Sequence, residues 1–389
     1  METVKKYKIV YCTPALYMAG GVERVLSLKA NYFAEQYGYD ITIILTEGKN
    51  KPLFYHLSDR INVINLDINF EELWNCSFLK KIFVYLKKQR KFKKLLSEEL
   101  LNIRPDITIS LLRREINFIN GIQDGSKKIG EIHINRANYR NFDKSQTNII
   151  KELFSKYWMR NLFNKLKRLD RLVVLTEKDK EAWVGLNNVS VIPNPLSFKP
   201  IAISPQSEKR VISVGRYCHE KGYDLLLRAW AKVQDVCPEW QLFIFGDGDR
   251  TEYERLLGLL NIDNSRCVLK GRTSDIQSEY AKSSLAVCSS RFEGFGLSII
   301  EAMSCGLPVV SFDCPWGPRS IILNYEDGIL VDKENSIALA DSLIMLMQDN
   351  ERREFMSKNA VKNVQRFDIE QIAPKWRLLF EEVCLCNMR

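Results

Sequence analysis

The sequence predicts an α/β protein made of two doubly wound domains, each a parallel sheet with helices on both faces. Three observations carry this prediction. The chain has 389 residues, which is enough for two domains of ordinary size. Apolar, strand-like runs alternate with helical stretches along both halves. Between the halves, "VIPNPLSFKPIAISPQSEKR" gathers four of the twelve prolines, as is typical of an interdomain linker.

The first half opens with the apolar run "YKIVYCTP", followed by a glycine turn and a helix from about Val22 to Gln36. This opening superficially resembles a signal peptide, but the turn and amphipathic helix that follow at once favour a first β-strand. A ligand crevice is expected beyond the carboxyl ends of the strands. The further strands expected here are "DITIILTEG", "INVINLD", "DITISLL", "SKKIGEIHIN" and "DRLVVLT".

The second half repeats the alternation. Its expected strands are "VISVGR", "WQLFIFGDG", "CVLKGR", "LAVCSS" and "PVVSFD". Helices are expected near Tyr223–Val236, up to Leu260 and through Glu301, and the tail from Asp368 to Cys384 has the pattern of an amphipathic helix. We therefore predict an N-terminal domain over 1–195, a C-terminal domain over 196–367 and a final helix within 368–389.

Composition narrows the class of protein. The net charge of +9 is uneven, because residues 1–195 hold 33 Lys and Arg against 21 Asp and Glu, and the remainder holds 24 against 27. This asymmetry suggests that the two halves meet different partners. The ten cysteines are scattered without a CxxC, and there are three histidines. This pattern favours reduced thiols in a cytosol and argues against a zinc site or a disulfide framework. No apolar run reaches the roughly 18 residues of a membrane-spanning helix.

Two basic residues follow the first strand of the second half. In "SVGRYCHEKGYDLLLRAW" the strand ends at Gly215, and Arg216 and Lys221 lie in the loop before the next helix. Cations at a strand's carboxyl end, beside a helix N-terminus, suit a diphosphate. The alternative is a solvated basic loop.

Two glutamates in "SSRFEGFGLSIIEAMSCGLPVVSFD" repeat this geometry. Glu293 lies in a glycine-rich turn after a strand, and the glycines let the backbone approach a ligand closely. Glu293 can then accept hydrogen bonds from sugar hydroxyls. Glu301 lies eight residues on, about 12 Å along a helical rise, where it could reach the ribose of a nucleotide.

These stretches together resemble a known family. "GRYCHEKG", "FGDGDR", "KGRTSDI", "RFEGFGLSIIEAMSCGLPVVSFD" and "EDGILV" look like the donor domain of the family 4 retaining glycosyltransferases of GT-B architecture. The N-terminal "AGGVERVLSLKANYFAEQYGYDITIIL" is similar to that family's first strand, glycine loop and helix. "DCPWGPRSII" resembles the subset that assembles bacterial surface polysaccharides, such as capsule and lipopolysaccharide, and lipid-linked oligosaccharides. The architecture implied has a C-terminal helix that crosses back to the first domain.

The resemblance implies a role for each matching residue. Arg216 and Lys221 would neutralise the donor diphosphate, Glu293 would hold the donor sugar and Glu301 the ribose. His133, in "IGEIHINRA", occupies the place of a histidine near the donor sugar in many relatives, although a structural histidine fits equally well. The remaining donor-binding residues implied are Gly20 and Gly21, which would close over the diphosphate, with Gly215, Gly271, Arg272, Thr273, Gly294, Phe295, Gly296 and Leu297.

The implied chemistry is transfer with retention at the anomeric carbon. The leaving phosphate oxygen would take the acceptor's proton, so no dedicated general base is needed. Asp247 and Asp249 form an Asp-x-Asp, which would hold a divalent metal in another glycosyltransferase architecture. Here Gly246 and Gly248 favour a turn leading into a helix cap. We expect no metal and no cofactor, with a nucleoside-diphosphate sugar as co-substrate.

Two basic amphipathic segments, near 78–100 and 152–169, suggest a membrane surface. The alternative is that their apolar faces pack on the sheet while the lysines are solvated. A membrane-facing acceptor domain would suit a lipid-diphosphate-linked saccharide and a cytoplasmic enzyme peripheral to the inner face of the membrane. No nucleic-acid-binding motif is present.

The sequence therefore predicts a hexosyltransferase that moves a hexose or N-acetylhexosamine to a polysaccharide or lipid-linked saccharide. A UDP-sugar is favoured over GDP-mannose as donor. A nucleotide-sugar epimerase of the same architecture, or a non-catalytic sugar-nucleotide-binding protein, are the alternatives. Strict dependence on an acceptor would favour the transferase, and product release from the donor alone would favour the epimerase.

Overall fold

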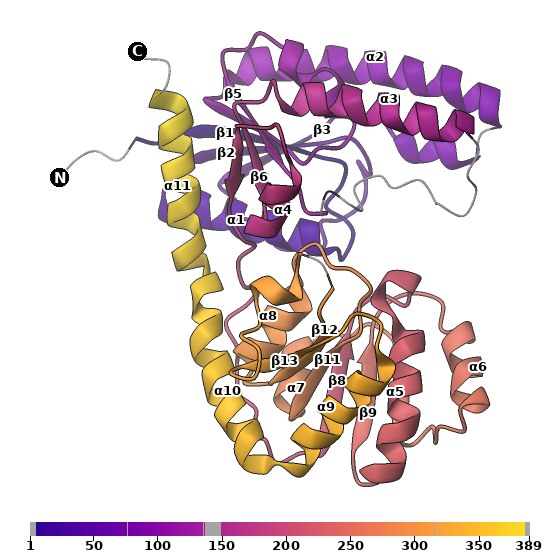
Figure 1. Cartoon of the computed structure of the whole chain (residues 1–389). Coiled ribbons are helices and arrows are strands. Elements are labelled where there is room, and N and C mark those ends of the chain that lie inside the picture. The colour runs from indigo at the N-terminus through magenta and orange to yellow at the C-terminus, as the bar shows by residue number, and fades with distance from the viewer. Residues whose placement is uncertain (1–4, 76, 135, 137–148, 315, 386–389) are drawn as a thin grey trace. The chain divides into compact units, whose positions relative to one another are not determined.

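The computed structural model describes residues 5–75, 77–134, 136, 149–314 and 316–385. The chain divides into two compact units (Figure 1). One holds the described residues up to Pro195 and those from Ile372 on, and the other runs from Leu196 to Gln371. The expected boundary at 367/368 lies four residues earlier than this second division. Lys199 forms a 2.7 Å ion pair with Glu370, which ties the first turn of the final helix to the second unit.

The first unit is built on a seven-stranded sheet of order β3-β2-β1-β4-β5-β6-β7, in which every neighbouring pair is parallel. Its core is formed by apolar residues of these strands, the central ones buried on both faces, together with apolar residues of the helices that cover the sheet. The strands are β1 (Lys8–Thr13), β2 (Asp40–Leu45), β3 (Ile61–Asn65), β4 (Ile107–Ser110), β5 (Lys127–Glu131), β6 (Arg171–Val174) and β7 (Val189–Val191). The helices are α1 (Gly21–Gln36), α2 (Phe78–Ile103), α3 (Ile149–Leu166), α4 (Glu177–Ala182) and α11 (Ile369–Leu385).

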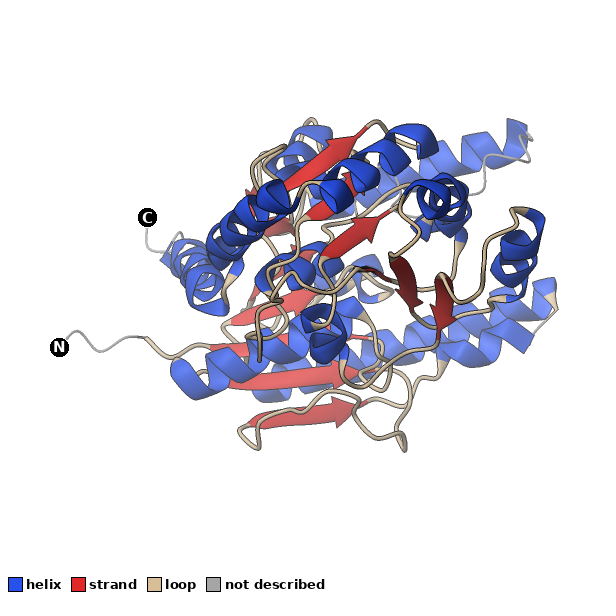
Figure 2. Cartoon of the chain, turned by 90° about the horizontal axis from the view of Figure 1, so that it is seen from below, coloured by secondary structure: helices blue, strands red, loops and turns tan. Residues whose placement is uncertain are grey.

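Helices cover both faces of this sheet (Figures 1 and 2). On one face, Phe92 and Leu96 of α2 and Leu162 of α3 are buried in the core cluster that contains Val10 and Cys12. On the other face, the second half of α11 packs in this unit, since the ring of Phe380 contacts those of Tyr7, Phe33 and Tyr39. The C-terminal segment thereby completes the first unit's core.

The second unit is built on a six-stranded parallel sheet of order β10-β9-β8-β11-β12-β13. The strands are β8 (Arg210–Val214), β9 (Gln241–Phe245), β10 (Cys267–Lys270), β11 (Leu285–Cys288), β12 (Val309–Phe312) and β13 (Gly328–Val331). The helices are α5 (Tyr223–Val236), α6 (Thr251–Leu259), α7 (Ile276–Ala281), α8 (Leu297–Ser304), α9 (Ser336–Gln348) and α10 (Asn350–Val364).

The predicted fold of two doubly wound parallel sheets is confirmed. Val211 on β8 packs with α5 and α9, while Ile212 and Val214 face Tyr280 of α7 and Ile299 of α8. This alternation buries both faces of the sheet, as parallel sheets require. Among the described residues, no helix is both long and apolar enough to cross a lipid bilayer.

Candidate active site

The candidate site of the second unit lies at the carboxyl ends of β8 and β11. These strands are neighbours in the sheet, and chain order runs outward from them in opposite directions, toward β9 and toward β12. Ligands of open α/β sheets bind at such a switch point, because the loops leaving the two strands diverge there. The two motifs singled out in the sequence are these two loops.

A partly buried ion pair joins the loops. Lys221, in the 3₁₀ turn His219–Lys221 after β8, places its Nζ 2.6 Å from Oε1 of Glu293, which follows β11. The two side chains are 22% and 12% exposed, and the hydroxyl of Ser290 donates to the same carboxylate oxygen at 2.7 Å. Burial alone would lower the pKa of Lys221, but the charge of Glu293 outweighs it and raises the pKa. Lys221 is therefore a fixed cation, and Glu293 is held in one place.

Two glycines allow the loops to touch through their backbones. Gly222 has φ +61°, and a Cβ added there would lie 2.1 Å from the carbonyl oxygen of Ser289. A Cβ on Gly246, after β9, would lie 1.8 Å from the carbonyl oxygen of Gly215. The sequence analysis treated Gly246 only as part of a turn. Gly222 was not singled out in the sequence, although a glycine directly before a helix start is a signal that could have found it.

Arg291 is a second clamp, which the sequence analysis did not single out. Its guanidinium makes two hydrogen bonds with the carboxylate of Asp224, at 2.8 and 2.6 Å, and also donates to the carbonyl of His219 at 2.8 Å. Burial works to raise the pKa of Asp224, but the hydrogen bond and charge of Arg291 lower it. Such bidentate pairs carry strict geometry. No local pattern announces this pair, since 67 positions separate its members.

The turn Glu293–Gly296 leads into α8, which begins at Leu297. Gly296 caps the helix with φ +108°, a conformation that favours glycine. Gly317, in the loop after β12, packs closely on this turn, because a Cβ there would lie 2.6 Å from the carbonyl oxygen of Phe295. The backbone N–H groups and the dipole of a helix start favour an anion. Gly294 lies between Glu293 and this helix start.

Glu301 and the loop after β10 belong to the same unit. Glu301 lies on the second turn of α8 and is 4% exposed, with Oε2 3.5 Å from the hydroxyl of Tyr280. Gly271, Arg272 and Thr273 follow β10 directly, at the same carboxyl edge of the sheet. Arg272 lies 3.5 Å from Asp247, and the hydroxyl of Thr273 accepts a hydrogen bond from the backbone of Asp275. Ribose and base contacts at these residues remain predictions.

Arg216 is an exposed cation at the carboxyl end of β8. It directly follows Gly215, its side chain is exposed, and no carboxylate lies within ion-pair distance of it among the described residues. Its guanidinium is thus available to an anionic ligand.

The Asp-x-Asp serves the local structure. Asp249 accepts hydrogen bonds from the backbone N–H and the hydroxyl of Thr251, at 3.0 and 2.7 Å, at the start of α6. Asp247 forms the 3.5 Å ion pair with Arg272. Within the described ranges, no three His, Cys, Asp or Glu side chains are grouped so that they could hold a metal ion.

Three predicted residues lie in the first unit, also at carboxyl ends of strands. Gly20 caps α1 and Gly21 begins it, in the loop after β1. The carboxylate of Glu23 folds back over Gly20, so closely that a Cβ there would lie 1.9 Å from it. A diphosphate at this helix start would compete with that carboxylate. His133 follows β5 and lines a small cavity with Val22 and Arg113.

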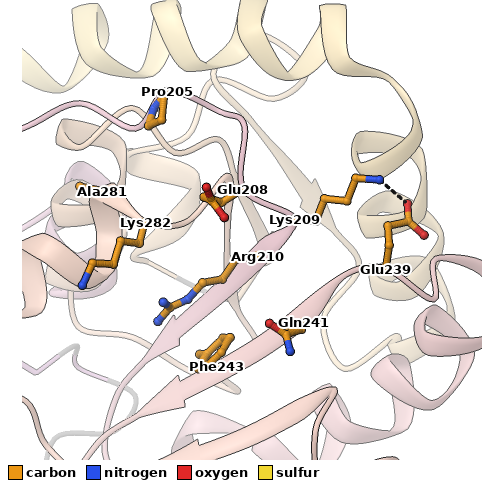
Figure 3. Close-up of a pocket in the computed structure, with 9 residues that line it drawn as sticks. All are labelled: Pro205, Glu208, Lys209, Arg210, Glu239, Gln241, Phe243, Ala281 and Lys282. Carbon is orange, nitrogen blue, oxygen red and sulfur yellow. Dashed lines mark ion pairs between the residues drawn. The ribbon is translucent and has the colours of Figure 1, made fainter.

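A separate pocket lies at the opposite edge of the second sheet (Figure 3). It has a volume of about 610 Å³ and lies where β8 and β9 begin, at Arg210 and Gln241. Each of its cations has a partner: Arg210 pairs with Glu279 and stacks on Phe243, Lys209 lies 3.4 Å from Glu239, and Lys282 lies 3.9 Å from Glu279. Neither predicted motif reaches this edge.

The fold and the site at the carboxyl ends of β8 and β11 define a class of protein. Two doubly wound parallel sheets, with cations, glycines and a helix start gathered at one switch point, are typical of α/β proteins that bind a phosphorylated ligand there. The family can be named from sequence similarity. Residues 197–363 match the family model "Glycosyl transferases group 1". The chain is also 30% identical over 364 residues to an uncharacterized glycosyltransferase of Haemophilus influenzae, covering 92% of this chain and 96% of that protein. The chain belongs to the group 1 glycosyltransferases.

Two further comparisons are informative. The chain is 26% identical over 379 residues to a Campylobacter jejuni enzyme named GalNAc-alpha-(1->4)-GalNAc-alpha-(1->3)-diNAcBac-PP-undecaprenol alpha-1,4-N-acetyl-D-galactosaminyltransferase, covering 94% of this chain and 96% of that one. A crystal structure of a mutant of TarM from S. aureus, in complex with Fondaparinux, alpha-GlcNAc-glycerol and UDP, superposes with a TM-score of 0.75 at 18% identity. That match covers 96% of this chain and 99% of TarM, and it supports the fold alone.

Proposed function

We propose that this glycosyltransferase is a retaining, metal-independent hexosyltransferase that uses a UDP-sugar and extends a saccharide carried on a polysaccharide or a lipid diphosphate. The observation that carries the proposal is the partly buried Lys221–Glu293 pair, together with the closely packed glycines and the helix start around it at the switch point of the second sheet. A cation and a carboxylate held side by side match two adjacent parts of a nucleotide-sugar, the diphosphate and the hydroxylated sugar ring.

In the proposed reaction, Lys221 and Arg216 contact the diphosphate and the start of α8 faces the same group. Glu293 accepts hydrogen bonds from the donor sugar. As the bond from the anomeric carbon to the phosphate oxygen breaks, negative charge grows on the diphosphate and positive charge on the sugar. The acceptor oxygen attacks on the same face and its proton passes to the leaving phosphate oxygen. Fixed cations stabilise this charge separation because they need no reorganisation during the reaction.

The donor preference has support from the comparisons. UDP is the nucleotide named with TarM, and the acceptor of the C. jejuni relative is a saccharide on undecaprenol diphosphate. We extend both to this chain as a proposal, in place of a GDP-sugar and of the epimerase. The test is a thermal-shift series with UDP, GDP, ADP and their common sugar conjugates in the presence of chelator. A ligand at a hundredfold excess over its dissociation constant adds about 2.7 kcal/mol to the free energy of unfolding.

A shift with UDP compounds alone would support the proposal, and transfer assays with UDP-glucose and UDP-N-acetylglucosamine would then separate the sugars. No shift with any nucleotide would contradict it. A shift with GDP compounds alone would keep the site and reject the UDP preference.

The first unit, which we propose binds the acceptor, also carries a surface suited to an anionic membrane. On α2, Ile82, Phe83 and Leu86 are 46%, 72% and 50% exposed. The exposed Lys80, Lys81 and Lys87 lie among them. Farther along α2 the apolar residues Phe92, Leu96 and Leu100 are buried in the core. The same helix therefore packs on the sheet at one end and presents apolar side chains with lysines at the other, as membrane-surface helices do.

The second basic segment, near 152–169, supports this less. Tyr157 on α3 is 69% exposed, while Leu162 and Leu166 are buried. The side chains of residues 149–156 lie outside the described residues. We place the proposed membrane contact, on the cytoplasmic face, at the start of α2.

A further inference from the structure

A buried chain of polar groups lies behind His133 in the first unit. Nε2 of His133 is 3.2 Å from Oε1 of Glu131, and the same oxygen accepts a hydrogen bond from Nζ of Lys29. The side chains of Lys29, Glu131 and His133 are only 1%, 2% and 8% exposed. Nζ of Lys29 also lies 4.2 Å from the ring centroid of Trp376, on the part of α11 that belongs to this unit. Side chains from α11, α1, β5 and the loop after β5 thus form one buried cluster, in which Lys29 and His133 contact Glu131 and Trp376 contacts Lys29.

Burying these charged groups lowers the stability of the fold unless other interactions compensate. Burying an ion pair loses hydration that the mutual attraction does not always return, and apolar residues often do as well in such places. Among the described residues, Oε2 of Glu131, Nε2 of His133 and the hydroxyl of Tyr11 are buried without a hydrogen-bond partner. The 3.2 Å approach of Nε2 to Oε1 is thus a close contact and not an aligned hydrogen bond. Burial raises the pKa of Tyr11, and the charge of Glu131 raises it further. This pair is therefore poorly explained as packing alone.

The charges indicate which way the carboxylate acts. Burial works to raise the pKa of Glu131, but Lys29 and His133 lower it to about 2. Burial lowers the pKa of Lys29, against the opposing effect of Glu131. The groups that face this carboxylate are Lys29 from α1, Tyr11 from β1 and His133, with Arg113 on the far side of the cavity that His133 lines. Glu131 is thus an anion that can hold a proton on Nε2 of His133.

We propose that Lys29 and Glu131 are positioning residues that hold the His133 imidazole with Nε2–H toward Glu131. Nδ1 is then the ring nitrogen left to meet a substrate hydroxyl in the small cavity with Val22 and Arg113. Trp376 supports the pair from behind, by covering the ammonium of Lys29. The catalytic consequence rests on the proposed function, because it needs a hydroxyl of a transferase substrate at His133. The geometry of the buried chain does not.

The test uses the small number of histidines. The chain has three, and the side chains of His56 and His219 are exposed. In protein labelled with ¹⁵N-histidine, we expect one ring N–H signal protected from exchange with water, absent in His133→Asn. The double variant Lys29→Met/Glu131→Met removes both charges together, so that neither is left buried alone. It should lose the signal and lower kcat for transfer from a UDP-sugar about tenfold or more, with a much smaller change in the KM of the donor.

Two further variants separate positioning from folding. In Lys29→Met/Glu131→Gln, the amide oxygen can still accept from Nε2–H, so the signal should return and kcat should recover in part. The matched control is Lys128→Met/Asp124→Leu, which removes another buried pair, 2.5 Å apart, involving the same strand β5. The control should lower the melting temperature and leave both the signal and kcat unchanged.

A missing N–H signal in the wild-type chain, or an unaltered one in Lys29→Met/Glu131→Met, would overturn the proposal. An altered signal with unchanged kcat would overturn the positioning role. A wild-type chain that shows the signal but binds no nucleotide would instead reject the proposed function and leave the buried chain standing.

Discussion

The two ends of the second sheet carry ion pairs that resemble each other closely. At the carboxyl end, Lys221 and Glu293 are 22% and 12% exposed, and at the amino end Arg210 and Glu279 are 15% and 22% exposed. The surroundings differ. At the carboxyl end, glycines allow close backbone contacts, a helix begins and Arg216 has no ion-pair partner among the described residues. At the amino end, every pocket cation has a carboxylate or ring partner. Burial of an ion pair therefore does not identify a site, and the backbone around it does.

The largest expected difference is in turnover. Lys221→Met should lower kcat for transfer about a hundred- to a thousandfold, because one fixed contact to growing charge contributes about 3–4 kcal/mol. Arg210→Met leaves a comparably buried carboxylate without its partner and should cost similar stability with little loss of kcat. Steady-state rates and melting curves of both variants give the comparison. Equal rate losses would mean that the two ends do not differ in function.

A second difference is in the backbone. Gly222→Ala should destabilise the chain by about 1–3 kcal/mol and weaken nucleotide binding, because φ is +61° and the new Cβ meets the carbonyl of Ser289. The control is Gly258→Ala on α6, where a Cβ meets nothing within 4 Å. That change should stabilise by about 0.5–1 kcal/mol. Chemical denaturation measures both, and a Gly222→Ala chain as stable as wild type would contradict the close approach of the loops.

The same kind of comparison applies along α2. Leu86 and Leu101 are both 50% exposed, but only Leu86 lies among exposed apolar residues and lysines at the start of the helix. Leu86→Ser should weaken binding to anionic vesicles several-fold, by roughly 1 kcal/mol or more of lost apolar burial, while Leu101→Ser should not. Vesicle co-sedimentation reports both. Equal retention of the two variants would remove this membrane surface.

The smallest expected effect concerns metal. Chelator should leave the transfer rate unchanged, since Asp249 accepts hydrogen bonds from Thr251 at the start of α6 and Asp247 pairs with Arg272. Asp249→Asn should lower the free energy of unfolding by at most about 1 kcal/mol, the usual contribution of a side chain that accepts hydrogen bonds at a helix start. A rate that falls with chelator and returns with manganese would make these aspartates metal ligands.

Much of the fold could be predicted from the sequence, for a physical reason. Strands buried on both faces are near-continuous apolar runs, so β1, β2 and β8 stand out. The strands β7, "VSV", and β13, "GILV", were not predicted because runs of three or four residues are too short to show a clear periodicity. Helices α4, α9 and α10 were also not assigned. Apolar residues occupy most positions of α9, so its sequence does not show one apolar face and one polar face.

The site could be predicted only in part. Arg216 and Lys221 lie in the loop after β8 and Glu293 lies in the loop after β11, so local order alone brings them to the same end of the sheet. The Arg291–Asp224 clamp and the Lys29–Glu131–His133 chain depend on residues 67 and 102 positions apart, which meet only after the sheet has formed. The division of α2 into a buried and an exposed end likewise depends on where the sheet stops, which no helical periodicity reveals.

The central claim is that the donor nucleotide binds at the carboxyl end of the second sheet, and hydrogen–deuterium exchange with UDP tests it most directly. We predict slower amide exchange on addition of UDP in the loops 215–222 and 289–297, and no change in 205–210, 239–243 and 279–282. Protection confined to the amino-end segments, or protection in neither set at saturating UDP, would contradict the account.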